Sequence, residues 1–161
     1  MPKTKILVIE DDREHRLDAM DFFESLLDVE VVYAKNYREA ESVMLDYDRE
    51  KGGRVKGDID GVISDIYSPL TSNPHWNQPE PIGVRVAIEL TQVGLPFVLN
   101  TAGYHHGRKY EWIHQFAGSQ RWTLVDNCGD YEQESDSKNW KRAYEALEKK
   151  LMKENKNVKN C

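Results

Sequence analysis

The chain has 161 residues, a length at which one domain with a substantial buried core is expected. Its net charge of -6, and the lack of a Lys/Arg cluster interleaved with aromatic residues before the C-terminal helix and tail, argue against nucleic-acid binding. No apolar run approaches the roughly 20 residues that a membrane span needs, so we expect a cytoplasmic protein that does not bind membranes.

Strands and amphipathic helices alternate in the first part of the chain. Residues 6–9 form a continuous apolar run, typical of a central strand covered on both faces. A helix is predicted next, with acidic residues in its first turn and an apolar stripe at Leu17, Met20, Phe23 and Leu27. Residues 29–34 predict the second strand. Asn36 and Glu39 resemble a capping box for a second helix with the stripe Ala40, Val43, Met44 and Tyr47.

The middle of the chain contains a third strand between two polar segments. The charged, glycine-bearing segment 48–57 predicts a solvated connection, and the apolar run 61–63 predicts the strand. Asp65 lies at the end of that strand. The insertion Ile66 to Pro81 holds four of the six prolines and predicts an irregular loop. Within it, Trp76 is a candidate for docking a partner or for covering the site.

The second half of the chain continues the alternation. We expect a helix closed by Gly94 with the stripe Ile82, Val86, Leu90 and Val93, then a strand at 96–99. A short helix at 108–117 and a fifth strand at 122–125 follow. The last helix is expected to begin at 135–137 and has the stripe Trp140, Tyr144, Leu147 and Leu151. Five strands alternating with five helices predict an α/β domain with a parallel sheet wound on both sides. We assign residues 1–154 to this domain and residues 155–161 to a frayed tail.

Three carboxylates are expected to meet at one edge of this sheet. Glu10 and Asp11 follow the first strand, and Asp65 follows the third. Carboxyl ends of parallel strands share an edge, where such folds place their chemistry. Carboxylates this close either retain a proton or bind a hard divalent cation, of which Mg²⁺ is the natural candidate. Such a site suits phosphoryl transfer, with one carboxylate attacking the phosphorus.

The motifs that carry these acids resemble the receiver domain of two-component response regulators. They are KILVIEDD at 5–12, SDIYSP at 64–69 and LNTAG at 99–103. The resemblance extends from about Lys3 to Leu151. It implies a flavodoxin-like, doubly wound, five-stranded parallel sheet in a single domain, with strand order 2-1-3-4-5.

The resemblance also implies roles for individual residues. Asp65 would be the phosphoacceptor, and the Mg²⁺ ligands would be Glu10, Asp11, Asp65 and the backbone carbonyl of Tyr67. Thr101, followed by Ala102 in the same motif, would hydrogen-bond a phosphoryl oxygen. Trp122 would be the aromatic residue whose rotamer follows phosphorylation, although core packing is the alternative interpretation.

The sequence departs from the family pattern at two places. The family expects a lysine at the end of the fifth strand, where this chain has Val125 or Asp126. Without that ammonium group an acyl phosphate is less neutralised, with Arg108 or Lys109 as candidate substitutes. The family's glycine shortly after the acceptor is displaced to Gly83 by the insertion.

Three functions follow from these patterns. The first is a stand-alone receiver domain of a phosphorelay, phosphorylated by a histidine kinase or phosphotransfer protein and signalling through a downstream protein partner or as a homodimer. This is a signalling protein with self-phosphorylation and self-dephosphorylation chemistry more than an enzyme. The second is a pseudo-receiver, a binding module independent of phosphorylation. The third is a phosphatase of the haloacid-dehalogenase type, in which Asp58 and Asp60 would act as nucleophile and acid.

Overall fold

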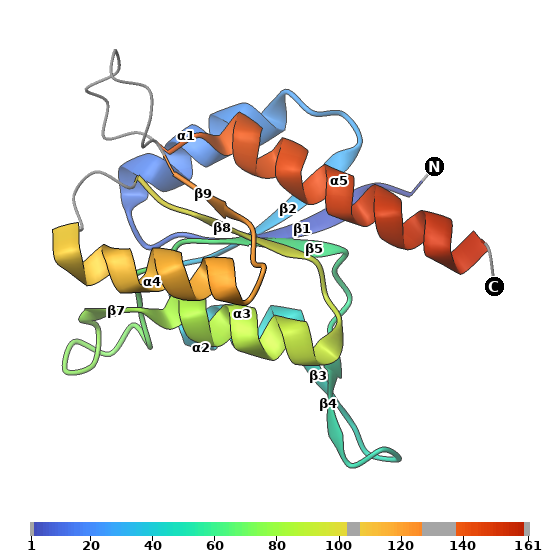
Figure 1. The fold of residues 1–161 in the computed structure, drawn as a ribbon, viewed down its shortest axis with the longest axis horizontal. Coiled ribbons are helices and arrows are strands. Elements are labelled where there is room, and N and C mark those ends of the chain that lie inside the picture. The colour runs from blue at the N-terminus through green and yellow to red at the C-terminus, as the bar shows by residue number, and fades with distance from the viewer. Residues whose placement is uncertain (1, 103–106, 127–137, 160–161) are drawn as a thin grey trace.

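A five-stranded parallel sheet forms the centre of the molecule (Figure 1). The computed structural model describes residues 2–102, 107–126 and 138–159, with side chains at 2–102, 111–126 and 138–154. The strands of the sheet follow the order β2-β1-β5-β8-β9, which is the predicted order 2-1-3-4-5. Their bounds are Val29–Ala34 for β2, Thr4–Ile9 for β1, Gly61–Ser64 for β5, Phe97–Asn100 for β8 and Leu124–Val125 for β9.

The register of the strands aligns the residues that follow them. Ile9 pairs with Ser64, and Ser64 pairs with Leu99. The next position on each strand therefore places Glu10, Asp65 and Asn100 in one row across the sheet. Because side chains alternate between the two faces of a strand, members of such a row lie on the same face.

Helices cover both faces of the sheet. Helices α1 (Arg13–Glu24) and α5 (Trp140–Lys159) lie on one face, and α2 (Tyr37–Met44), α3 (Ile82–Val93) and α4 (Gly107–Ser119) lie on the other (Figure 1). Parallel neighbours need such crossover helices, so this arrangement follows from the predicted alternation. None of the described helices combines the length and apolarity that a membrane span needs.

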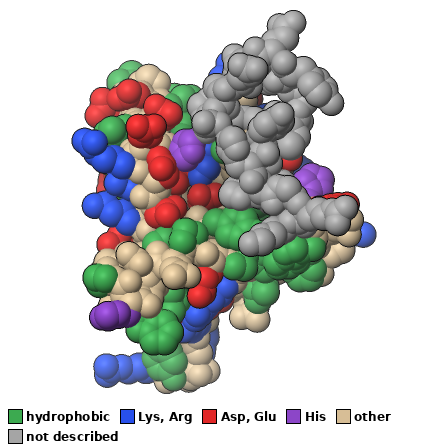
Figure 2. Space-filling view, turned by 90° about the vertical axis from the view of Figure 1, so that its left-hand side faces the viewer, with side chains coloured by type: hydrophobic (Ala, Val, Ile, Leu, Met, Phe, Trp, Pro, Cys, Tyr) green, Lys and Arg blue, Asp and Glu red, His purple; other side chains and the backbone are tan. Residues whose placement is uncertain are grey.

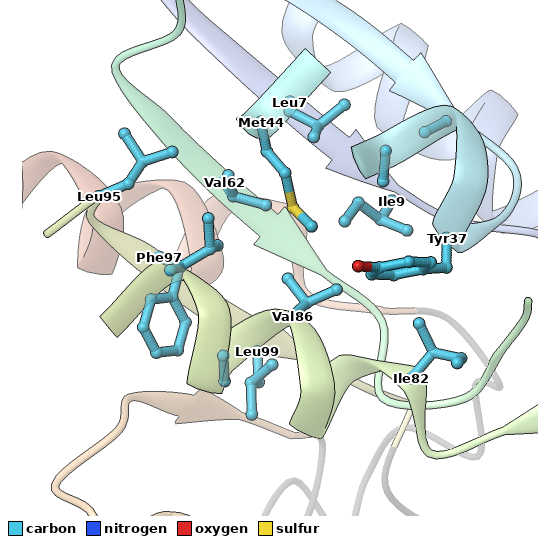
Figure 3. Close-up of a cluster of buried hydrophobic side chains, with 14 of the residues drawn as sticks. Leu7, Ile9, Tyr37, Met44, Val62, Ile82, Val86, Leu95, Phe97 and Leu99 are labelled. Atoms are coloured by element: carbon cyan, nitrogen blue, oxygen red, sulfur yellow. The ribbon is translucent and has the colours of Figure 1, made fainter. Parts of the chain in front are cut away.

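Each layer of helices encloses its own hydrophobic core. The α3-side core contains apolar side chains from the sheet, α2, α3 and α4, among them Leu7, Ile9, Met44, Val86 and Leu99 (Figure 3). The α5-side core lies between the sheet, α1 and α5, and includes Val8, Phe23, Val98, Trp140 and Leu147. The strand tips between these two cores are therefore held firmly from both sides.

Several predicted helix signals are present as capping interactions. The carboxylate of Asp12 accepts hydrogen bonds from the backbone N–H groups of Glu14 (2.8 Å) and His15 (3.0 Å) at the start of α1. Asn36 caps α2 through the N–H of Glu39 at 2.9 Å. Gly94 ends α3 with a left-handed φ of 70°, a conformation that glycine adopts without strain. The caps at Asn36 and Gly94 confirm the helix ends expected there.

The connection predicted at 48–57 is wrong. The chain forms an antiparallel hairpin of β3 (Leu45–Asp48) and β4 (Gly53–Lys56), in which Tyr47 pairs with Arg54. Helix α2 therefore ends at Met44, and Tyr47 is an exposed strand residue instead of the last member of a helical stripe. The hairpin projects away from the sheet, below α2 and α3 in the view of Figure 1.

Three smaller differences concern the helices and the insertion. The insertion contains a short antiparallel pair, β6 (Ser68–Pro69) and β7 (Pro79–Glu80). Two members of the first predicted stripe, Leu17 and Leu27, are exposed, because α1 ends at Glu24 and packs through Ala19 and Phe23. The predicted start of the last helix at 135–137 lies outside the described residues. Helix α5 begins at Trp140 and continues to Lys159, into the residues expected to fray.

Candidate phosphoryl-transfer site

Three carboxylates meet at the carboxyl edge of the sheet, as the sequence predicts. Carboxylate oxygens of Glu10, Asp11 and Asp65 lie within 4.8 Å of one another. Glu10 is buried, whereas Asp11 and Asp65 are partly exposed. Figure 2 views this end of the molecule and shows acidic side chains gathered in its upper half. The cluster can therefore be reached from solvent while one of its members stays fully inside.

Backbone contacts fix the loop that carries two of these acids. The N–H of Glu10 donates to the carbonyl of Ala34 at 2.9 Å, which continues the strand ladder past Ile9. The guanidinium of Arg16 donates to the carbonyl oxygens of Glu10 and Asp11, both at 3.0 Å. Helix α1 thus holds the β1–α1 turn, and the two carboxyl groups remain available to face Asp65.

The protonation of the acids is shifted by their surroundings. Burial, and then the charge of Asp65, raise the pKa of Glu10 well above the usual range of a glutamate. The same two causes raise the pKa of Asp11. Both shifts therefore come first from burial and second from the negative charge of a neighbouring carboxylate. A divalent cation bound between the carboxylates would favour their ionised forms.

A cation that sequence reasoning missed lies in this cluster. The ammonium of Lys138 donates to the Oε2 of Glu10 and lies 2.8 Å from the Oδ2 of Asp65, and its side chain is only 2% exposed. Burial alone would lower the pKa of Lys138, but the charges of Asp65 and Glu10 outweigh burial and raise it. The expectation that an ammonium group is missing from the site is therefore wrong.

The start of α5 explains how Lys138 reaches the acids. Asn139 caps the helix by accepting a hydrogen bond from the N–H of Arg142 at 2.9 Å. The next residue, Trp140, packs in the α5-side core. Lys138 precedes this cap and extends over the strand tips. The only local signal in the sequence is a lysine followed by an asparagine, a good N-cap residue, just before the apolar stripe of the last helix.

The end of β9 has the side chains that the sequence predicts, and no lysine. Val125 is buried in the α5-side core, and the carboxylate of Asp126 lies 3.7 Å from the imidazole of His114. Arg108 and Lys109 belong to α4, and their side chains are outside the described set. The ammonium group in the cluster therefore comes from Lys138, which precedes α5, and not from the end of β9.

Backbone hydrogen bonds hold Asp65, the phosphoacceptor candidate, and the residue that follows it. The N–H of Asp65 donates to the carbonyl of Ile9 at 2.9 Å, and the N–H of Ile66 donates to the Oδ1 of Asp65 at 2.6 Å. Gly83 donates its N–H to the carbonyl of Ile66 at 2.9 Å. An added Cβ at position 83 would lie 2.4 Å from the carbonyl oxygen of Asp65. The displaced glycine thus packs directly behind the acceptor.

The remaining predicted residues lie around this centre. Thr101 is buried at the tip of β8, where its N–H donates to the carbonyl of Val125 at 3.0 Å, and Ala102 follows it, partly buried. Tyr67 follows the acceptor strand and packs against the α3-side core. Their roles toward a phosphoryl group or a metal stay predictions.

The two tryptophans singled out in the sequence have different surroundings. Trp122 packs against the α3-side core, with edge-to-face contacts to Phe97 (6.0 Å between centroids) and Phe116 (5.3 Å). Trp76 is 67% exposed in the loop between β6 and β7. A partner or lid role for Trp76, and a switch role for Trp122, stay predictions.

The donor set of the cluster fits a hard divalent cation. Glu10, Asp11 and Asp65 provide only carboxylate oxygens, which are the ligands that Mg²⁺ prefers. The partly exposed Asp11 and Asp65 leave room for water on the solvent side, and Mg²⁺ keeps several of its waters. These three residues would therefore hold the ion.

The residues of the phosphatase hypothesis lie at the opposite end of the sheet. Asp58 and Asp60 precede β5, at its amino end, and the fully exposed Asp58 forms an ion pair with the partly buried Lys5 at 2.9 Å. The backbone N–H of Lys5 donates to Asp60 at 2.7 Å. A haloacid-dehalogenase nucleophile needs the carboxyl end of a strand, so the geometry contradicts this hypothesis.

The fold is that of response-regulator receiver domains. The chain is similar to the signal receiver domain of an HD domain-containing protein from Pseudomonas fluorescens Pf-5, with a TM-score of 0.59 and 13% identity over 100% of this chain and 96% of that one. The non-phosphorylated HemR receiver domain from Leptospira biflexa matches with a TM-score of 0.52 and 20% identity, covering 92% and 94% of the two chains. A third similar structure is the RcsB response regulator of Salmonella typhimurium. It matches with a TM-score of 0.51 and 13% identity, over 80% of this chain and 53% of that one.

These similarities concern structure alone. The sequence matches no family model, and a search of curated proteins found no match.

Proposed function

We propose that the protein is a receiver domain that accepts a phosphoryl group on Asp65 and signals through protein contacts. The observation that supports this most directly is the cluster at the carboxyl edge of a receiver-type sheet. It combines the acids Glu10, Asp11 and Asp65 with the ammonium of Lys138. Mg²⁺, held by the three carboxylates and the backbone carbonyl of Tyr67, would supply neutralisation of the phosphate oxygens when bound.

The residues of the chain suit an in-line phosphoryl transfer. An oxygen of Asp65 forms a bond to phosphorus while the bond from phosphorus to the donor's leaving atom breaks, and that electron pair leaves with the donor. The Oδ1 of Asp65 is oriented by the N–H of Ile66, and Lys138 lies beside Oδ2. Lys138 would balance charge that moves onto the phosphoryl oxygens, and Thr101 would donate a hydrogen bond to one of them.

The donor and the recipient of the signal follow from this chemistry. A histidine kinase or a phosphotransfer protein in the cytoplasm would supply the phosphoryl group, because phosphohistidine is a reactive donor toward a carboxylate. The output would be contact with a downstream protein or with a second copy of this chain.

Intact-mass analysis after incubation with acetyl phosphate and Mg²⁺ tests the proposal. We expect one phosphoryl adduct on the wild-type protein and none on Asp65→Asn. Asp58→Asn, a fully exposed acid at the other end of the sheet, is the matched control and should be modified like the wild type. An adduct that persists in Asp65→Asn would contradict the assignment of the acceptor.

One observation supports a pseudo-receiver as the second candidate. Lys138 pairs with both Glu10 and Asp65, so an internal cation already balances part of the cluster. A domain of this kind would bind its partner without phosphorylation. It predicts a folded wild-type protein that gains no adduct from acetyl phosphate and Mg²⁺.

A further inference from the structure

We propose that the first turn of α5 is the element that responds when Asp65 is phosphorylated, and that Lys138 transmits the change to it. This inference rests on the proposed phosphoacceptor role of Asp65 and concerns which part of the domain moves. It follows from the position of Lys138 on the chain. A lysine on a strand is held by the sheet ladder, whereas Lys138 directly precedes a helix.

The charge that Lys138 balances would move when Asp65 is modified. The ammonium now lies 2.8 Å from the Oδ2 of Asp65 and also bonds Glu10. An acyl phosphate carries its negative charge on the phosphoryl oxygens, farther from the backbone than the former carboxylate. A buried ammonium that loses one of its two partners is strongly destabilised, so Lys138 is expected to follow the charge.

Packing limits how the side chain of Lys138 can move toward the phosphoryl oxygens. Its side chain is 2% exposed, so a change of rotamer alone meets neighbouring atoms. Farther along α5, Ala143 and Leu147 are fully buried against the sheet and hold the body of the helix. The displacement should therefore be concentrated at Lys138, at the cap Asn139 and at Trp140.

Two buried groups beside this turn lack hydrogen bonds in the described part of the structure. One is the indole N–H of Trp140. The other is the side-chain amide of Asn100, a fully buried residue, in which neither Nδ2 nor Oδ1 has a partner. Asn100 occupies the same row as Asp65 and lies on the same face of β8 as Val98, which belongs to the α5-side core. Buried polar groups without partners are unfavourable, so little hydrogen bonding holds the side chains of Trp140 and Asn100 in their resting positions.

The family's switch residue lies on the other side of the sheet. Trp122 packs on the α3-side core, whereas Lys138 contacts acids that face α5 and Trp140 belongs to the α5-side core. A response on the α3 side of the sheet can therefore be followed at Trp122, and a response on the α5 side at Trp140. Trp76 and Trp112, which are 67% and 49% exposed, serve as references on the surface.

Fluorine NMR on the full chain labelled with 5-fluorotryptophan tests the inference. Each of the four resonances is assigned with the corresponding Trp→Phe variant. Mg²⁺ and beryllofluoride, a mimic of the phosphoryl group, are then added, and the bound beryllofluoride gives its own fluorine signal. We expect the Trp140 resonance to shift in step with that bound signal and by more than the resonance of Trp122.

Three variants assign the shift to Lys138. Lys138→Met should bind beryllofluoride at higher concentration but lose the Trp140 shift. Lys138→Arg, which keeps the charge, should retain it. Lys141→Met is the matched control, because it removes an exposed lysine from the same helix, and it should behave like the wild type. If Lys138→Met does not fold, the inference is tested by the wild type alone, in which the Trp140 resonance should shift by more than the Trp122 resonance.

The outcomes separate this inference from the proposed function. A bound beryllofluoride signal with an unmoved Trp140 resonance overturns the inference and leaves the acceptor role intact. A Trp140 shift that persists in Lys138→Met also overturns it. No bound signal, together with no adduct from acetyl phosphate, overturns the acceptor role and with it the inference.

Discussion

At position 83, the absence of a side chain allows α3 to pack against the backbone of the acceptor. An added Cβ would lie 2.4 Å from the carbonyl oxygen of Asp65 and 2.7 Å from the Cα of Ile66. Both neighbours are backbone atoms of a strand end, which cannot rotate away as a flexible side chain could. The shape of the acceptor turn therefore depends on this glycine.

We predict that Gly83→Ala destabilises the protein by about 1–3 kcal/mol, the usual cost of overpacking. It should also lower the yield of the phosphoryl adduct, because Asp65 is displaced. Urea unfolding and intact-mass analysis measure the two effects. Gly118→Ala is the matched control, since an added Cβ at this exposed helical position meets nothing within 4 Å. Equal effects of the two substitutions would contradict this account of Gly83.

Single residues also show where sequence reasoning reaches its limit at the site. Glu10, Asp11 and Asp65 could be predicted to meet because each directly follows a strand, and parallel strands align their carboxyl ends. Lys138 could not, because its side chain reaches the acids only through the tertiary position of a helix start. Asn100 was missed for a related reason: only the register shows that it shares a row with Asp65.

The hairpin of β3 and β4 is the element least like the prediction, and side-chain contacts attach it to two helices. Arg54 on β4 bonds Glu41 of α2 at 2.9 Å and Glu89 of α3 at 3.0 Å. The hydroxyl of Tyr37 also donates to Glu89. The hairpin is thus joined to the α3 face of the domain through one arginine.

We predict that Arg54→Ala loosens the hairpin with little effect on the whole domain. Amide hydrogen exchange should become faster at residues 45–56, while the free energy of unfolding falls by about 1 kcal/mol, because the Arg54 side chain is half-exposed and its ion pairs are partly screened by water. Lys51→Ala is the control, because the ammonium of Lys51 lies 3.8 Å from Asp48 of the same hairpin and is 78% exposed. Unchanged exchange in Arg54→Ala would show that backbone pairing alone holds the hairpin.

The wrong end of the second predicted helix has a physical cause. Tyr47 continues the helical spacing of Ala40, Val43 and Met44, so local periodicity favours a longer helix. The backbone of Tyr47 instead pairs with Arg54 across a turn that contains Gly52, with a φ of 65°. Long-range pairing of this kind overrides periodicity. The buried strands were predicted correctly because their apolar runs are too short for helices and bounded by turn residues.

For the molecule as a whole, the acid cluster links metal binding to stability. A ligand that binds only the folded state raises stability with its concentration, by about 2.7 kcal/mol at a hundred times its Kd. The carboxylate oxygens of Glu10, Asp11 and Asp65 come within 4.8 Å of one another only because the fold brings two strand ends together, so the unfolded chain has no such site. Addition of Mg²⁺ should therefore stabilise the entire fold.

We predict that Mg²⁺ raises the melting temperature of the wild type and that Asp11→Asn abolishes this increase. Thermal unfolding followed by circular dichroism, with and without Mg²⁺, measures it. Asp12→Asn removes the neighbouring charge but keeps a good N-cap for α1, and it should retain most of the increase. A Mg²⁺ effect that survives Asp11→Asn would place the ion elsewhere.

Helix α5 both packs against the sheet and positions the lysine of the acid cluster. Its inner side chains, Trp140, Ala143 and Leu147, close one face of the sheet, and the residue just before it provides the counter-charge for the acids. Any lesion that detaches this helix would uncover the sheet and leave three carboxylates facing each other without their lysine. Loss of folding and loss of charge balance at the site should therefore occur together.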